Sequence, residues 1–65
     1  MFNIGDIIYK RRNELMIGGK ELADDLEISP AHLHYIENGK HMPSLKLLIK
    51  ICEKLNMDIQ IVAKI

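Results

Sequence analysis

The sequence predicts an all-α fold, a compact bundle of four to five short helices. Apolar residues recur at the three-to-four-residue spacing of a helix in several successive stretches. Capping residues and glycines separate these stretches, at positions typical of helix starts and ends. The chain has 65 residues, 48% of them hydrophobic and 28% charged, and this composition indicates one folded domain rather than a disordered tail.

The first helix is expected to begin after Asn3, whose side chain suits a helix cap. Arg12 falls on the apolar stripe of this helix, where a charged group needs either a carboxylate partner or a position at the edge with only its stem buried. The Gly18-Gly19 pair is expected to end this helix and to open a second one. The two apolar stripes consist of Ile4, Ile7, Ile8 and Leu15, and of Leu22, Ala23 and Leu26.

A third helix is expected from Pro30 to Asn38. Ser29 can cap it, Pro30 suits its first position because the missing N–H would be unpaired there, and Asn38-Gly39 supplies a left-handed stop. One side of this helix is apolar and must pack on the domain, because a helix this short is not stable alone. The apolar side carries Leu33 and Ile36, and the other side carries Ala31, His34, Tyr35 and Asn38. That second side is a candidate recognition surface.

A fourth helix is expected to run from the cap Ser44 to about Leu55. Its apolar arc is wider than one core-facing side requires, which suggests a second contact surface. Asn56 can take the left-handed position that ends the helix. The arc consists of Leu45, Leu47, Leu48, Ile49, Ile51, Cys52 and Leu55.

The last residues predict a β-strand, because Ile59, Ile61, Ala63 and Ile65 alternate with Gln60, Val62 and Lys64. No second strand candidate exists in this chain, so the simplest pairing partner is the same strand of a second copy about a two-fold axis. We therefore expect a domain at residues 1–58 and a dimerisation tail at 59–65. The predicted dimer contacts are Leu47, Ile51, Ile59, Ile61 and Ile65.

The sequence offers no residue set for catalysis, a metal ion or a cofactor. No nucleophile and base are evident at a shared site, and there is no phosphate-binding loop. Cys52 is the single cysteine, and no Cys/His set has the spacing of zinc ligands. His32 and His34 lie two residues apart on a helix and cannot chelate one metal from a common face. We therefore expect no enzyme, no metal and no cofactor.

No apolar run approaches the ~20 residues that span a bilayer, and the N-terminus lacks the charge order of a signal peptide. A lone cysteine suits a reducing compartment, so we expect a cytoplasmic protein without membrane contact. Nine Lys+Arg and nine Asp+Glu give a formal net charge of +0, which removes the usual compositional argument for nucleic-acid binding. Charge placement must decide that question instead.

Several short motifs carry a family likeness at matching spacing. They are Glu21-Leu22-Ala23, Ile28-Ser29, Tyr35-Ile36-Glu37-Asn38-Gly39-Lys40, Pro43-Ser44 and Leu55. Together they resemble the Cro/C1 (Xre) helix-turn-helix family of phage and bacterial repressors, over roughly Ile4 to Asp58. The resemblance implies a lambda-repressor-like fold and double-stranded DNA as partner. The tail is weakly similar to that of HipB-type antitoxins, whose terminal strand pairs across a dimer.

The resemblance also implies residue roles. Base-contact positions of the recognition helix fall on Pro30, Ala31, His32, His34 and Tyr35. Backbone-contact positions fall on Gly18, Gly19, Lys20, Asn38, Gly39, Lys40 and His41. Arg12 matches a position that pairs with Glu37 as a scaffold contact. From the residues alone, His32 and His34 are equally well explained as solvated surface side chains, and Tyr35 as a half-buried core residue.

Two positions depart from the family pattern. A Ser/Thr-Gln pair usually opens the second helix, and its glutamine binds a phosphate; here Gly18-Gly19 offers only bare N–H groups. The usual glycine between the second and third helices is Glu27, which puts a side chain at a left-handed turn.

These observations predict a homodimeric, sequence-specific DNA-binding regulator, most simply a repressor, with the third helix in the major groove. The alternative is the same fold as a protein-interaction module, such as an antitoxin or an anti-repressor target. The zero net charge, the Gly18-Gly19 pair and the apolar tail favour this alternative.

Overall fold

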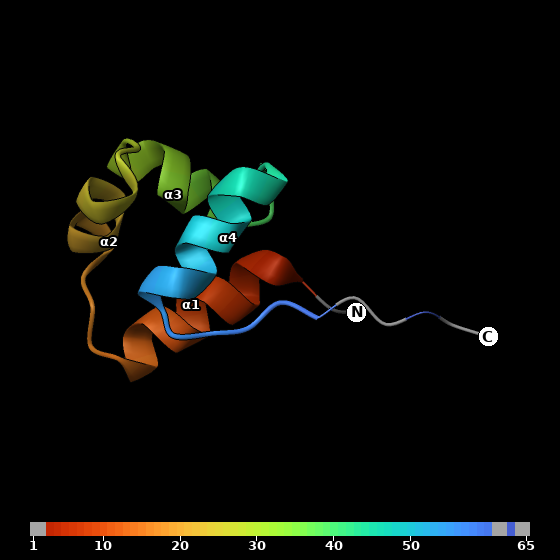
Figure 1. Cartoon of the computed structure of the whole chain (residues 1–65). Helices are drawn as coiled ribbons and strands as arrows, with labels where there is room; N and C mark the ends of the chain where they lie inside the picture. The colour runs from red at the N-terminus through yellow and green to blue at the C-terminus, as the bar shows by residue number, and fades with distance from the viewer. Residues whose placement is uncertain (1–2, 61–62, 64–65) are drawn as a thin grey trace.

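Four α-helices form the described part of the computed structural model, which covers residues 3–60 and 63. They are α1 (Ile4–Glu14), α2 (Gly19–Leu26), α3 (Pro30–Glu37) and α4 (Leu45–Lys54). α2 and α3 lie together at one end of the molecule, and α1 and α4 pack against them (Figure 1). The prediction of an all-α bundle of short helices is confirmed. None of the four helices is both long and apolar enough to cross a bilayer.

Side-chain caps begin three of the helices. The Asn3 side-chain oxygen accepts a hydrogen bond from the Gly5 N–H at 2.9 Å, and Ser29 Oγ accepts one from the His32 N–H at 3.0 Å. Ser44 Oγ accepts one from the Leu47 N–H at 3.2 Å. Each cap satisfies a backbone donor that has no partner inside the helix. α2 begins at Gly19, and its N-cap residue Gly18 provides no side-chain cap.

The end of α1 differs from the sequence prediction. The helix stops at Glu14, and Met16 takes the left-handed conformation with φ 59°. The turn is closed by hydrogen bonds from the Met16 N–H to the Asn13 oxygen and from the Ile17 N–H to the Arg12 oxygen, both 3.0 Å long. The Gly18-Gly19 pair therefore opens α2 but does not end α1. Asn56, at φ 54°, ends α4 in the left-handed conformation as predicted.

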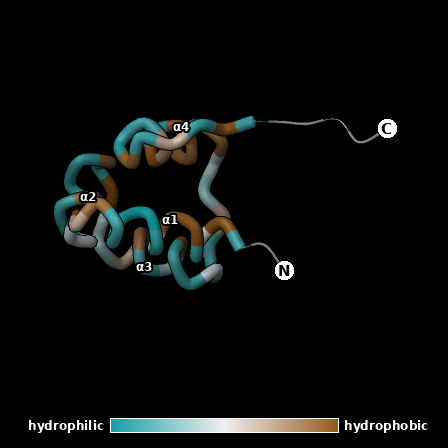
Figure 2. Tube along the Cα trace, turned by 90° about the horizontal axis from the view of Figure 1, so that it is seen from below, coloured by the Kyte–Doolittle hydropathy of each residue, from teal (hydrophilic) through white to brown (hydrophobic). Residues whose placement is uncertain are grey.

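The core lies where the four helices meet. Its buried members are Ile8, Leu22, Ala23, Leu26, Leu33, Ile36, Ile51 and Leu55. In Figure 2 the hydrophobic positions of α4 lie toward the other helices and its hydrophilic positions lie away from them. Leu15 is 37% exposed, so it does not belong to the core stripe of α1.

α4 corrects the predicted dimer contacts. Ile51 is 0% exposed and Leu47 is partly buried against the core, on the helix that packs against α2. Ile51 is therefore a core residue and not a dimer contact. Leu45 and Ile49 are 63% and 43% exposed, so the outer edge of the apolar arc is the side that faces solvent.

The segment after α4 runs back along α1 toward its N-terminal end (Figure 1). Residues 58–60 have no regular secondary structure, and Ile59 is 40% exposed. Ile61 and Ile65 lie outside the described residues. The strand and the division of the chain at residue 58 stay predictions.

α1 and α3 approach each other closely at Gly5. A Cβ atom placed on Gly5 would collide with the backbone oxygen of Ile36 and would lie 2.6 Å from that of Glu37. Backbone atoms of a helix cannot move away cheaply, so only glycine allows this contact. The N-terminal end of α1 thereby sits against the C-terminal end of α3, with the two helix dipoles in favourable contact.

We expect Gly5→Ala to lower the free energy of unfolding by about 1–3 kcal/mol, because the methyl group must push α1 and α3 apart. Urea denaturation followed by circular dichroism measures this. Gly19→Ala is the control, since its Cβ would lie 3.8 Å from the nearest Arg12 atom, an ordinary contact, and alanine favours helix. Equal stability of Gly5→Ala and the native chain would contradict the packing described.

Candidate nucleic-acid interface

α2 and α3 are joined by a tight link of residues 27–29. Glu27 takes the left-handed conformation with φ 59°, and its N–H bonds to the Asp24 oxygen at 3.1 Å. The Ile28 N–H bonds to the Ala23 oxygen at 3.0 Å. These bonds satisfy the last carbonyls of α2 and turn the chain sharply into the Ser29 cap of α3. Two helices joined in this way form a helix-turn-helix unit.

α3 has a buried side and an open side. Leu33 and Ile36 are 2% and 1% exposed and fix the helix to the core. The open side carries Pro30, Ala31, His34 and Tyr35, all of them exposed. Tyr35 is 48% exposed and does not belong to the core cluster, although the sequence also allowed a half-buried core position for it. Four of the five candidate base-contact residues therefore share one accessible surface.

His32, the fifth candidate, lies at the edge of that surface. Its side chain is only partly exposed, and its ring meets the ring of His41 edge-on, with centroids 5.5 Å apart and planes at 89°. This contact joins α3 to the following loop. His32 is placed better to hold the loop than to reach a base.

The loop of residues 38–41 winds back on the end of α3. The backbone N–H groups of Lys40 and His41 both bond to the Tyr35 oxygen, at 2.9 and 3.2 Å. The Asn38 side-chain amide donates to the His34 oxygen at 2.7 Å, and Gly39 has φ 76°. All four loop residues are exposed. The candidate backbone contacts of this loop therefore lie directly beside the open side of α3.

The N-terminal end of α2 has no side-chain cap. Gly18 and Lys20 are exposed, and a Cβ atom on Gly18 would meet nothing within 4 Å. The first N–H groups of α2 have no side-chain cap, so their dipole is free to face an anion.

A buried ion pair joins α3 to α1. Arg12 Nε lies 2.8 Å from one Glu37 oxygen, and Arg12 Nη2 lies 3.1 Å from the other. The two side chains are 11% and 7% exposed. Arg12 Nη1 also donates to the Ile17 oxygen at 2.9 Å, and the guanidinium lies over the Tyr9 ring, 5.3 Å from its centroid. The hydrogen bonds to Glu37 raise the pKa of Arg12 above its ordinary value, so the guanidinium stays charged.

The comparisons with known proteins agree with this geometry. The family described as helix-turn-helix matches residues 8–62. The chain belongs to this family, in its Cro/C1 (Xre) branch. The fold and family of this helix-turn-helix protein are those of DNA-binding transcription regulators, which are not enzymes.

One relative of this helix-turn-helix chain is the ImmF control region 10 kDa protein of Bacillus phage phi105. It is 34% identical over 58 residues, which are 89% of this chain and 64% of that protein. The crystal structure of the clp gene regulator ClgR from Corynebacterium glutamicum superposes with a TM-score of 0.79 at 28% identity. That match covers 82% of this chain and 56% of ClgR. The chain thus spans less than two thirds of the length of either relative.

Sequence reasoning missed Tyr9, an exposed aromatic residue of α1. It lines a surface hollow together with Asp6, His34, Glu37 and Asn38, at the C-terminal edge of the open side of α3. Only the contact between α1 and α3 places it there. Nothing in the spacing of residues along the first helix could have indicated this.

The remaining polar groups give no second chemical site. In the described residues no three His, Cys, Asp or Glu side chains are grouped as metal ligands. Burial, and secondly the charge of Asp58, raise the pKa of the Cys52 thiol, which therefore stays protonated at neutral pH. A protonated, buried thiol of this kind is inert.

We expect Arg12→Met to destabilise the domain by about 3–5 kcal/mol, because it leaves the Glu37 carboxylate buried without a partner. Arg12→Met combined with Glu37→Leu should recover most of that loss, since no charge is then stranded. Thermal unfolding of the three proteins gives the comparison. If the double variant is as unstable as Arg12→Met, the unpaired Glu37 carboxylate is not the cause of the lost stability.

Proposed function

We propose that this chain is a sequence-specific transcription regulator that binds double-stranded DNA as a homodimer and acts as a repressor. The observation that carries the proposal is the open side of α3, four exposed residues on a helix that is capped, buried on its other side and fixed by an ion pair. A helix held rigidly with one free face fits the major groove. A dimer that covers its site excludes other proteins from it, which makes repression the simplest outcome.

Within this proposal the contacts divide into two kinds. Ala31 meets a thymine methyl group, while His34 and Tyr35 reach base edges or phosphates, because all three are exposed on the side of α3 opposite Leu33 and Ile36. Residues 38–41 and the start of α2 contact phosphates, and so position the helix without choosing a sequence. Two subunits read half-sites about one helical turn, ~34 Å, apart.

The names of both relatives support a regulatory role. One is a protein of a phage control region and the other is a regulator of clp genes. The alternative role, a protein-interaction module such as an antitoxin or an anti-repressor target, is favoured by the formal net charge of +0 and the bare glycine start of α2. Purification from the native host separates the two roles, since a stoichiometric protein partner without DNA binding supports the module.

Selection of bound duplexes from a random pool tests the proposal. We expect enrichment of a two-fold symmetric sequence with half-sites about one turn apart. Failure to bind any duplex at low salt would refute the proposal.

We expect Lys40→Ala to weaken binding on all sequences alike and to reduce the slope of log affinity against log salt by about 1, because one phosphate contact is lost. His34→Ala and Tyr35→Ala should instead change the preferred bases, each by roughly 1–3 kcal/mol of discrimination. Lys10→Ala is the matched control, since Lys10 lines a hollow to which no α3 residue contributes. If His34→Ala and Tyr35→Ala, like Lys40→Ala, change only overall affinity, α3 is not the recognition helix.

We expect Gly18→Thr combined with Gly19→Gln to tighten binding by roughly 3- to 10-fold on all duplexes, since each new polar group can donate to a phosphate. The structure has room for both side chains, because neither glycine needs a positive φ and neither is tightly packed. Fluorescence anisotropy with a selected duplex measures the gain. The double alanine variant, which adds bulk without donors, should show no gain.

A further inference from the structure

Tyr9 brings an aromatic side chain from α1 to the edge of the open side of α3. It is 54% exposed and lines a hollow of about 380 Å³ between the two helices. The other lining residues are Asp6 of α1 and, at the end of α3, His34, Glu37 and Asn38. His34 and Asn38 are candidates for contact with DNA, so Tyr9 lies beside them without a role of its own in the helix-turn-helix unit.

The Tyr9 ring is held in place before any partner binds. The Arg12 guanidinium lies 5.3 Å from the centre of the ring, and Arg12 is itself fixed by its two bonds to Glu37. A cation over the face of an aromatic ring attracts the ring. The phenol therefore has less conformational freedom to lose when its hydroxyl group donates a hydrogen bond to a partner.

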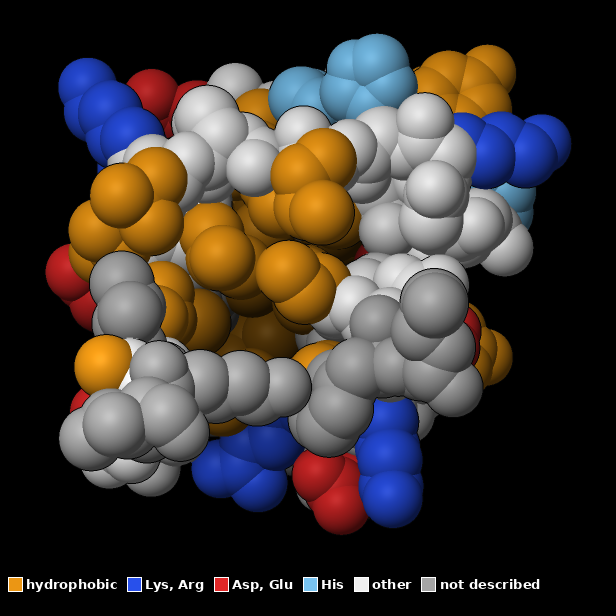
Figure 3. Space-filling model, turned by 90° about the vertical axis from the view of Figure 1, so that its right-hand side faces the viewer, with side chains coloured by type: hydrophobic (Ala, Val, Ile, Leu, Met, Phe, Trp, Pro, Cys, Tyr) orange, Lys and Arg blue, Asp and Glu red, His pale blue; other side chains and the backbone are white. Residues whose placement is uncertain are grey.

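The positive charge of this chain is limited and spread out. The formal net charge is +0, and on the face that Figure 3 shows, the Lys and Arg side chains are dispersed around the rim and do not form one basic patch. Contacts to DNA phosphates are also made by neutral donors, among them the tyrosine hydroxyl. A hydroxyl adds a phosphate contact without a positive charge, which suits a chain of this composition.

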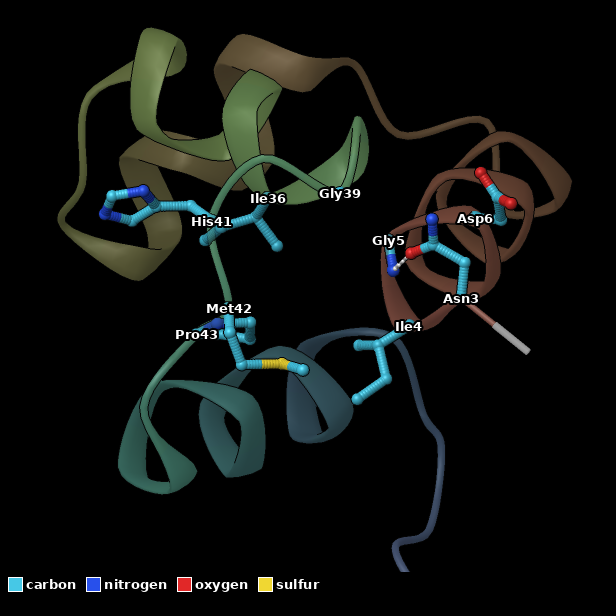
Figure 4. Close-up of a pocket in the computed structure, with 9 residues that line it drawn as sticks. All are labelled: Asn3, Ile4, Gly5, Asp6, Ile36, Gly39, His41, Met42 and Pro43. Atoms are coloured by element: carbon cyan, nitrogen blue, oxygen red, sulfur yellow. Dashed lines mark hydrogen bonds between the residues drawn. The ribbon is translucent and has the colours of Figure 1, made fainter. Parts of the chain in front are cut away.

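Arg12 neutralises one of the two carboxylates that line the hollow. Both oxygens of Glu37 are bound by Arg12, at 2.8 and 3.1 Å. The other carboxylate belongs to Asp6, which is exposed in the first turn of α1. Asp6 also lines the neighbouring cavity, and Figure 4 shows its carboxylate turned away from Ile4 and Met42. Asp6 is therefore the acidic group that a phosphate at the hollow would meet.

The size of the major groove decides which part of DNA α1 can meet. A helix with its side chains is about 10–12 Å across, and the major groove is about 12 Å wide, so the groove admits one helix. When α3 occupies the groove, α1, which packs against α3, stays outside at the edge. The edge of the groove is the sugar–phosphate backbone. A donor on α1 beside the end of α3 therefore meets a phosphate and not a base.

We propose that the Tyr9 hydroxyl donates a hydrogen bond to a DNA phosphate that lies at this hollow. The inference rests on the proposed function and extends its contact surface from α2, α3 and the following loop to α1. Tyr9 is a positioning residue in this arrangement. It fixes the duplex against the C-terminal end of α3 and does not select a sequence.

Tyr9→Phe tests the inference, because it removes the hydroxyl and keeps the ring that packs on Arg12. With a duplex selected for the native chain, we expect roughly 3- to 10-fold weaker binding in fluorescence anisotropy, and the same factor on duplexes with changed bases. The slope of log affinity against log salt should stay at the native value, because no cation is lost, whereas Lys40→Ala should reduce it. A loss confined to certain base sequences would show contact with a base and overturn the inference.

Duplexes in which one phosphate at a time is replaced by an uncharged methylphosphonate locate the contact. At the phosphate that Tyr9 contacts, the difference in affinity between the native chain and Tyr9→Phe should be smaller than on any other duplex, because a hydrogen bond to an uncharged acceptor is weaker. A difference of the same size at every position overturns the inference.

Asp6→Asn is a second variant, with an effect of the opposite sign. Removal of this charge should tighten binding by roughly 2- to 5-fold at low salt, and the gain should fade as the salt concentration rises. Glu14→Gln is the matched control, since Glu14 is an exposed acid of the same helix and lines a hollow to which no α3 residue contributes. Equal gains in the two variants would reflect net charge alone and overturn the inference.

Binding by the native chain separates this inference from the proposed function. If the native chain binds a selected duplex and Tyr9→Phe binds it equally well, the inference fails and the proposed function stands. If the native chain binds no duplex, the proposed function fails and the inference fails with it.

Discussion

The Arg12–Glu37 ion pair is the contact on which the arrangement of the other elements depends. Arg12 belongs to α1, its guanidinium also binds the Ile17 oxygen just before α2, and Glu37 is the last residue of α3. One side chain thus connects α1, α3 and the segment that leads into α2. α3 is short and enters the core through Leu33 and Ile36, so a third fixed point near its end sets its rotation. The rotation of α3 decides which residues face outward. The buried ion pair therefore fixes which side chains form the open side.

The sequence predicted the helix ends correctly at positions where a local rule applied. The caps at Asn3, Ser29 and Ser44 and the stop at Asn56 each depend on one side chain and its nearest backbone, and all are present in the structure. The end of α1 was placed wrongly because its left-handed residue is Met16. A methionine rarely takes positive φ, and the neighbouring glycines gave a stronger signal.

The wide apolar arc of α4 shows where spacing alone is insufficient. Leu47, Ile51 and Leu55 satisfy helical periodicity, and so do Leu45 and Ile49, which are exposed. Which stripe is buried depends on the position of α2, a tertiary contact that periodicity does not contain. The second contact surface stays a prediction, and Ile51, which the sequence assigned to it, lies in the core. The same limit applies to Tyr9, which reaches the edge of α3 only through the packing of α1.

The electrostatics of the chain make dimerisation matter to the proposed function. With equal numbers of acidic and basic residues, and with no side chain at Gly18 or Gly19 to hold a phosphate, one domain has few ways to bind DNA tightly. Joining two weak half-site contacts makes the second contact intramolecular, which multiplies affinity without adding a charge. Neutrality also removes the repulsion that would keep two copies apart. The neutral composition that weakens the contact of a single α3 with DNA thus favours the dimerisation that compensates for it. A regulator of this kind would lose its binding to DNA sharply when diluted below the concentration at which dimers form.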